Sequence, residues 1–185
     1  MKKRKETINL QSANVASVAI MLGALAVVLG LYALVWHPDV SKEGFAMGMW
    51  VRPYGGLLFV VAMAVGIVVH ELIHGATWAC FAPSRWKSIS FGVIWKMLTP
   101  YCHCSEPLLV RHYRIGALMP LYVLGVLPAL AGIAIGSLAL ALYGVLFVGA
   151  AAGDIMVAWR LRKEAPESKV QDHPTEAGYW VYEED

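Results

Sequence analysis

Charged residues are scarce in this sequence of 185 residues, where they make up only 15% of the chain. Soluble globular domains carry about 25% charged residues, so this composition excludes an ordinary soluble domain. Hydrophobic residues account for 58% of the chain and the mean hydropathy is +0.58, which indicates a membrane protein. Cysteine is also rare. The three cysteines are an odd number, which argues against a disulfide framework and favours reduced thiols.

The sequence instead contains four long apolar runs. Each is close to the ~20 residues that a helix needs to cross the hydrocarbon core, and they cover residues 14–36, 55–82, 115–136 and 137–159. Only Gly136 and Ser137 separate the last two runs, which predicts a tight two-residue turn. The first run is too long for a signal peptide and no small-residue cleavage site follows it, so we expect a retained anchor. The predicted fold is an all-α membrane protein with four transmembrane helices.

Positive charges are distributed unevenly between the predicted loops. Thirteen of the 15 Lys and Arg residues lie in residues 1–13, in the loop 83–114, or at and beyond the end of the last helix. Only Lys42 and Arg52 lie in the loop between the first two helices. Because loops rich in Lys and Arg stay on the cytoplasmic side, both termini and the loop 83–114 are predicted to be cytoplasmic. We therefore expect a multi-pass protein of the cytoplasmic membrane.

The loop 83–114 has the pattern of a small β-hairpin. Apolar residues alternate with smaller residues along 87–95, a period of two that is typical of a half-buried strand. Residues 96–104 can form a second strand, interrupted by Pro100. This hairpin would lie against the membrane face of a transmembrane domain formed by residues 14–160. Beyond it, residues 161–185 are polar and read as a cytoplasmic tail.

Four ionisable residues lie inside the predicted helices: His70, Glu71, His74 and Asp154. A charged residue at the centre of a membrane helix costs at least ~2.5 to 3.5 kcal/mol, so each is a candidate functional residue. The structural alternatives are a hydrogen bond to a neighbouring helix for the two histidines and an interfacial position or a pairing with Arg160 for Asp154.

His70 and His74 are four residues apart, so they lie on the same helical face, one turn from each other. With Glu71 they form the pattern H-E-x-x-H. In this pattern the two imidazoles bind zinc and the glutamate activates the water bound to the metal. The sequence therefore predicts a Zn²⁺ site on the second helix, with Glu71 as the catalytic base.

A catalytic zinc usually has three protein ligands, and Asp154 is the candidate for the third. His74 lies roughly 12 Å and Asp154 roughly 9 Å from the cytoplasmic ends of their helices, at 1.5 Å per residue, so their depths match. The run Gly149–Gly153 contains no side chain larger than a methyl group. Such small residues let membrane helices approach closely, which would bring Asp154 within reach of His70 and His74.

These residues resemble a known family. The motif HELIHG in a membrane helix, a cytoplasmic hairpin and an aspartate on a later helix are similar to small four-span zincin-type membrane metalloproteases, related to the site-2 proteases. The resemblance covers roughly residues 55 to 160. It implies a zinc-dependent peptidase that acts within or next to the bilayer, with His70, His74 and Asp154 as zinc ligands and Glu71 as general base. Asp154 stands between Gly153 and Ile155, whereas site-2 proteases place this aspartate in a Leu-Asp-Gly context.

The resemblance implies a membrane-protein or peptide substrate, and we expect no nucleic-acid partner. An exposed strand edge at residues 87–95 could hold an unwound substrate segment by strand addition. His103, Glu106 and His112 read as residues of a solvated loop. Three other functions stay open: a transporter of zinc or another divalent metal, a haem protein, and a membrane protein that binds zinc without catalysis. The sequence leaves the oligomeric state open.

Overall fold

The computed structural model describes residues 2–7, 10–37, 54–95, 99–173 and 178–183. Most of the predicted outer loop, with Lys42 and Arg52, lies outside these ranges. The long helices in chain order are α1 (Leu10–Trp36), α3 (Gly55–Phe81), α4 (Val110–Pro120), α5 (Leu127–Ile135), α6 (Leu138–Ala150) and α7 (Ala152–Leu161). A short 3-10 helix, η1 (Arg85–Ser88), follows α3, and a π-helical segment, η2 (Leu121–Val126), joins α4 to α5.

Three helical segments are long and apolar enough to cross a membrane: Asn14–Trp36, Gly55–Phe81 and Val110–Ile135. The third is continuous through α4, η2 and α5. The fourth predicted span is divided into α6 and α7, which are bent by 49° at Ala151 and count as one span only if the pair is taken together. The chain is thus a mostly helical protein with three or four segments suited to a bilayer.

The predicted tight turn lies between α5 and α6. Gly136 has a φ of +72°, a left-handed conformation that suits glycine, and it ends α5. The Ser137 backbone N–H donates to the Gly132 carbonyl over 2.8 Å. The Ser137 hydroxyl caps α6 by accepting a hydrogen bond from the Leu140 N–H over 3.4 Å. Two residues are therefore enough to reverse the chain.

Glycines let α5 and α6 pack backbone against backbone. A Cβ placed on Gly132 would lie 2.3 Å from the Ala141 nitrogen, and one on Gly144 would lie 2.5 Å from the Ala129 nitrogen. Both distances are too short for any side chain. The pair forms a core with α1, in which Val28, Tyr32, Ala129, Ile133, Ala141 and Val145 are buried.

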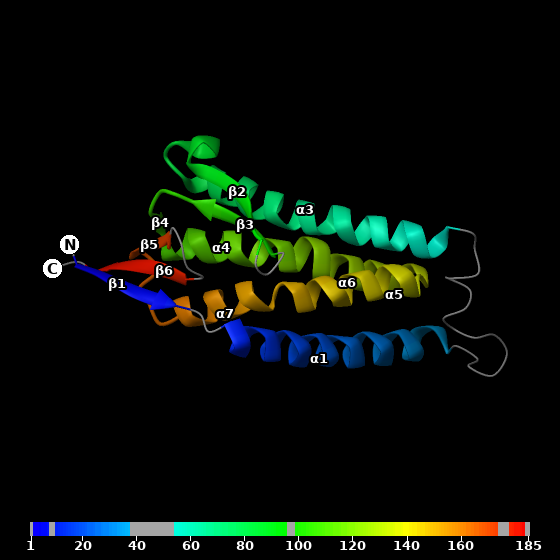
Figure 1. Cartoon of the computed structure of the whole chain (residues 1–185). Helices are drawn as coiled ribbons and strands as arrows, with labels where there is room; N and C mark the ends of the chain where they lie inside the picture. Colours follow the sequence, from blue (N-terminus) through cyan, green and yellow to red (C-terminus); the bar gives the residue numbers. More distant parts are fainter. Residues whose placement is uncertain (1, 8–9, 38–53, 96–98, 174–177, 184–185) are drawn as a thin grey trace.

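The structure corrects the all-α prediction, because the two ends of the chain form a four-stranded sheet. Its strands are β1 (Lys2–Thr7), β4 (Leu108–Leu109), β5 (Lys169–Asp172) and β6 (Gly178–Glu183), in the order β1-β6-β5-β4. Antiparallel pairing of β1 with β6 brings the two termini together at one end of the helices (Figure 1). The termini thus share a side, and the cytoplasmic identity of that side stays a prediction.

The predicted hairpin is present as β2 (Ile89–Ile94) and β3 (Thr99–Cys104), paired antiparallel with Phe91 opposite Cys102. It lies beside α3 at the same end of the molecule as the four-stranded sheet (Figure 1). A Cβ on Gly75 would lie 2.6 Å from the Phe91 ring and 3.0 Å from the Ile89 side chain. The glycine that ends the HELIHG motif therefore lets β2 pack directly on α3.

A second core joins the four-stranded sheet to the ends of the helices beneath it. Its largest members come from α3, α4, α7, β5 and β6, and include Trp78, Tyr113, Leu161, Val170 and Tyr179. The polar tail expected from the sequence is therefore partly built into the fold, where it supports the ends of α3 and α4.

The glycine packing of α6 yields a stability prediction. Gly144→Ala should destabilise the protein by about 1 to 3 kcal/mol, because the methyl group would meet the backbone of α5. Thermal unfolding of the purified protein in detergent measures the change. Gly23→Ala on α1 is the matched control, since a Cβ there has no atom within 4 Å. Equal stabilities for the two variants would contradict the packing described here.

Candidate metal centre

Helix α3 carries His70 and His74 on one face, and both are buried, with 8% and 5% of their surface exposed. Their imidazole rings are 4.8 Å apart between centroids. The two Nε2 atoms face each other at 3.2 Å. The spacing of four residues thus brings two ring nitrogens to a common point, as helical geometry requires.

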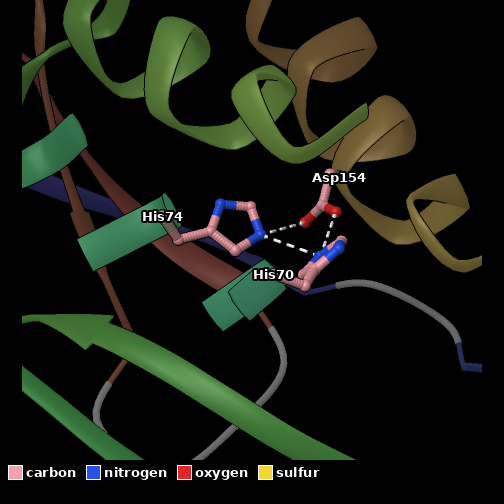
Figure 2. Close-up of side chains that lie close together, drawn as sticks. All are labelled: His70, His74 and Asp154. Carbon is pink, nitrogen blue, oxygen red and sulfur yellow. Dashed lines mark hydrogen bonds and ion pairs between the residues drawn. The ribbon is translucent and has the colours of Figure 1, made fainter. Parts of the chain in front are cut away.

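Asp154 reaches the same point from the first turn of α7 (Figure 2). Its Oδ2 lies 3.2 Å from His70 Nε2 and its Oδ1 lies 3.3 Å from His74 Nε2. All three residues offer one ligand atom within 4.8 Å of the others, and they are the one such group of three among the described residues. The structure therefore brings together the three side chains that the sequence predicts as metal ligands.

The two glycines before Asp154 do not provide the contact with α3 that the sequence analysis expected. Gly149 packs on α1, where an added Cβ would lie 2.9 Å from Met21, and Ser17 donates a hydrogen bond to the Gly149 carbonyl over 2.8 Å. Gly153 has no atom within 4 Å of an added Cβ. Gly149 therefore serves the contact with α1, and the run contains the bend at Ala151, after which Asp154 points toward α3.

A backbone carbonyl on α4 orients the His74 ring. His74 Nδ1 lies 2.9 Å from the Gly116 oxygen. Because a carbonyl can only accept, Nδ1 carries a proton, which leaves Nε2 as the ring nitrogen that faces Asp154. Pro120, four residues after Gly116, has no N–H to donate to this oxygen, so the carbonyl lacks its usual helical donor.

Gly116 also makes room for the aromatic side chain below His74. A Cβ on Gly116 would lie 2.1 Å from Trp78 Nε1. The Trp78 ring stacks on His74 at 5.1 Å and on Tyr113 at 5.0 Å, and its N–H donates to the Tyr113 carbonyl over 3.1 Å. The Gly116 carbonyl and the Trp78 ring thus hold His74 from two sides, which the sequence analysis missed. A proline within a membrane helix is the signal that could have identified the freed carbonyl.

Packing, rather than a hydrogen bond, holds the Nδ1 side of the His70 ring. Among the described residues, its buried Nδ1 has no hydrogen-bond partner. The Phe147 ring of α6 lies 6.4 Å away between centroids. Gly66, one turn before His70, admits Phe147 and the Tyr143 hydroxyl, each 2.4 Å from an added Cβ.

The donor set fits a divalent metal ion. The set comprises two imidazole nitrogens and one carboxylate, all of them groups that zinc takes as ligands in proteins. The two Nε2 atoms are 3.2 Å apart, and each lies 3.2 or 3.3 Å from a different oxygen of the Asp154 carboxylate. Charge-assisted hydrogen bonds are shorter, about 2.7 to 2.9 Å. Ligands of a tetrahedral zinc, with bonds of ~2.0 to 2.2 Å, lie about 3.3 to 3.5 Å apart, which is close to the spacing here.

Glu71 lies beside this centre and faces the hairpin. The backbone N–H of Cys102 on β3 makes a hydrogen bond to its carboxylate. Burial, together with the nearby Glu71 carboxylate, raises the pKa of the Cys102 thiol well above its ordinary value. Cys102 therefore contributes its backbone amide to the site while its side chain stays a protonated thiol.

The loop residues noted in the sequence lie outside the centre. Glu106 accepts hydrogen bonds from the N–H and hydroxyl of Ser84, over 2.9 and 2.6 Å, which lowers the pKa of its carboxyl. His112 stacks on Phe81. His103 Nδ1 lies 3.7 Å from Asp172 on β5. These contacts are structural and involve no metal-ligand group.

Comparison with known proteins agrees with this arrangement. A family model described as "Putative zincin peptidase" matches residues 63–169, more than half of the chain and the whole segment that carries His70, Glu71, His74 and Asp154. Searches of curated proteins and of solved structures returned no match. On the strength of the family match, the chain belongs to this family of zincin-type peptidases.

Proposed function

We propose that this protein is a zinc-dependent membrane peptidase of the site-2 protease type, with His70, His74 and Asp154 as the zinc ligands and Glu71 as the general base. The observation that carries the proposal is the convergence of two imidazole nitrogens and one carboxylate at spacings of 3.2 to 3.3 Å inside a bundle of apolar helices. Its substrate is a peptide bond of a membrane protein or peptide, within or next to the bilayer on the cytoplasmic side.

Zinc bound at this centre supplies Lewis acidity, which lowers the pKa of water toward ~7 and polarises the scissile carbonyl. Glu71 takes the proton from the attacking water and returns it to the leaving amine. The Cys102 N–H holds the Glu71 carboxylate in place for both transfers. The Gly116 carbonyl keeps the proton of His74 on Nδ1, which leaves Nε2 free to bind the metal.

Metal analysis tests the ligand assignment. We expect about one zinc per chain in the purified wild type and a loss of zinc in His74→Ala and Asp154→Asn, because each change removes one of three ligands. Glu71→Gln should retain zinc and lose cleavage by about 100-fold or more, as expected for loss of a general base. Elemental analysis and a peptide-cleavage assay measure these effects.

Well-folded wild type without zinc would contradict the assignment. Zinc uptake into proteoliposomes that persists in Glu71→Gln would instead favour a transporter. A wild type that binds zinc and cleaves no membrane peptide would favour a zinc-binding protein without catalysis.

The open edge of the hairpin supports strand addition as the mode of substrate binding. The Ser105 N–H donates to the Ser88 carbonyl across the hairpin over 2.9 Å, so Ser90 and Gly92 also point toward β3. The backbone groups of Phe91 and Val93 therefore point to the other edge, where β2 pairs with no further strand in the described part of the chain. A substrate strand added to this edge of β2 would lie about two strand spacings, roughly 10 Å, from β3 and its Cys102 N–H. The substrate chain would therefore have to extend beyond the added strand to reach Glu71.

Val93→Pro tests this mode of binding, because it removes an outward N–H from the open edge. We expect KM for a peptide substrate to rise severalfold while the zinc content stays unchanged. Val93→Thr is the control, since it keeps the N–H and a β-branched side chain of similar shape. Cleavage by Val93→Pro at the wild-type KM would exclude pairing at this edge.

A further inference from the structure

Asp172 is a buried carboxylate that the metal centre does not use. It ends β5, lies outside the matched segment 63–169, and exposes only 11% of its side chain. Burying a carboxylate is costly unless several donors satisfy it. Its partners therefore indicate what it stabilises.

Three partners from two other elements surround this carboxylate. The Tyr113 hydroxyl of α4 donates to Oδ1. The backbone N–H of Cys104 on β3 donates to Oδ2 over 2.8 Å, and His103 Nδ1 lies 3.7 Å from the same oxygen. One side chain thus joins the end of the hairpin to the helix that orients His74. A neighbouring hydrogen bond, from Gln171 Nε2 to the Ser105 carbonyl, links β5 to the residue that follows β3.

The hydrogen bonds of Asp172 form a tether between β5, β3 and α4. The geometry of β3 connects this tether to Glu71, the proposed general base. Cys102 and Cys104 are two residues apart on one strand, so their N–H groups point off the same edge. Asp172 accepts the hydrogen bond of one and Glu71 accepts that of the other. Fixing Cys104 therefore sets the position at which Cys102 meets Glu71.

On the α4 side, aromatic packing connects the Asp172 carboxylate to His74. Tyr113 stacks on Trp78, and Trp78 stacks on His74. Helix α4 also supplies the Gly116 carbonyl, which accepts a hydrogen bond from His74 Nδ1. Asp172 thus contacts both the strand that orients Glu71 and the helix that orients His74.

We infer that Asp172 is a positioning residue that holds β3 against α4, so that the Cys102 amide orients Glu71 for proton transfer. The catalytic part of this inference rests on the proposed peptidase function, whereas the tether itself does not. The C-terminal strand β5 thereby contributes a residue that positions the candidate active site.

Substitution of Asp172 in the full chain tests the inference. Asp172→Ala removes both hydrogen-bond acceptors. Asp172→Asn can keep the tether, because its amide can accept from the Cys104 N–H and donate to the Tyr113 hydroxyl oxygen. Lys169→Ala is the matched control, an exposed residue on the same strand. Three measurements apply to each variant: hydrogen exchange of residues 99–104, zinc per chain, and kcat and KM for a membrane peptide.

We expect faster exchange of residues 99–104 in Asp172→Ala, with zinc retained. Its kcat should fall by about 10- to 100-fold, as for loss of an outer-shell partner, while KM changes less than about threefold. Asp172→Asn should recover most of the kcat, and Lys169→Ala should match the wild type. If Asp172→Ala does not fold, Tyr113→Phe removes one partner from the opposite side, and a smaller fall in kcat with zinc retained is expected.

Unchanged exchange of residues 99–104 in Asp172→Ala would overturn the tether. Faster exchange with an unchanged kcat would overturn the positioning role, as would a kcat in Asp172→Asn as low as in Asp172→Ala. A wild type that neither binds zinc nor cleaves would refute the proposed function instead, and the exchange measurement would still decide the tether.

Discussion

The centre of this structure is the convergence of two histidines and one aspartate from two different helices. Two imidazole nitrogens and a carboxylate meet at 3.2 to 3.3 Å, and the hydrogen bond from His74 Nδ1 to the Gly116 carbonyl turns Nε2 toward Asp154. In an apolar bundle a buried carboxylate is costly unless positive charge lies beside it. The surrounding fold can be understood as the set of contacts that holds these three groups together.

Close approach to α3 is the means by which the fold builds this centre. Glycines at positions 66, 75 and 116 admit α6, the hairpin and Trp78 at distances that no side chain would allow. The first half of α3, by contrast, exposes Leu58 and Val61 by 66% and 50%. In a bilayer these apolar side chains would face lipid, so the tight contacts of α3 are concentrated around the candidate metal ligands.

The four-stranded sheet gives this end of the molecule a rigid support. It joins the N-terminal strand to the C-terminal strands and covers a core that includes Trp78 and Tyr113. The hairpin, the sheet and the metal-proximal ends of the helices are linked by side chains from β5, chiefly Asp172. The part of the chain that looked like a solvated tail is therefore continuous with the packing around the centre.

Local patterns account for what the sequence predicted well. Apolar runs identified the membrane-suited helices, Gly136 marked the turn, and a period of two located the hairpin, because each of these depends on neighbouring residues. The sequence did not predict the four-stranded sheet, because β1 and β5 are short and polar and because β1 pairs with a strand at the opposite end of the chain. Such pairing leaves little trace in local composition.

The sequence by itself determined the facing pair of histidines and the neighbouring glutamate, because a helix necessarily places residues four apart on one face. Only the tertiary structure decided how Asp154 meets them, through a bend at Ala151 that composition did not indicate. It also decided that Gly116, Cys102 and Asp172 orient the site, because these contacts join residues 42, 31 and 68 positions apart. Contacts of that range depend on how the helices and strands pack, and no local pattern encodes them.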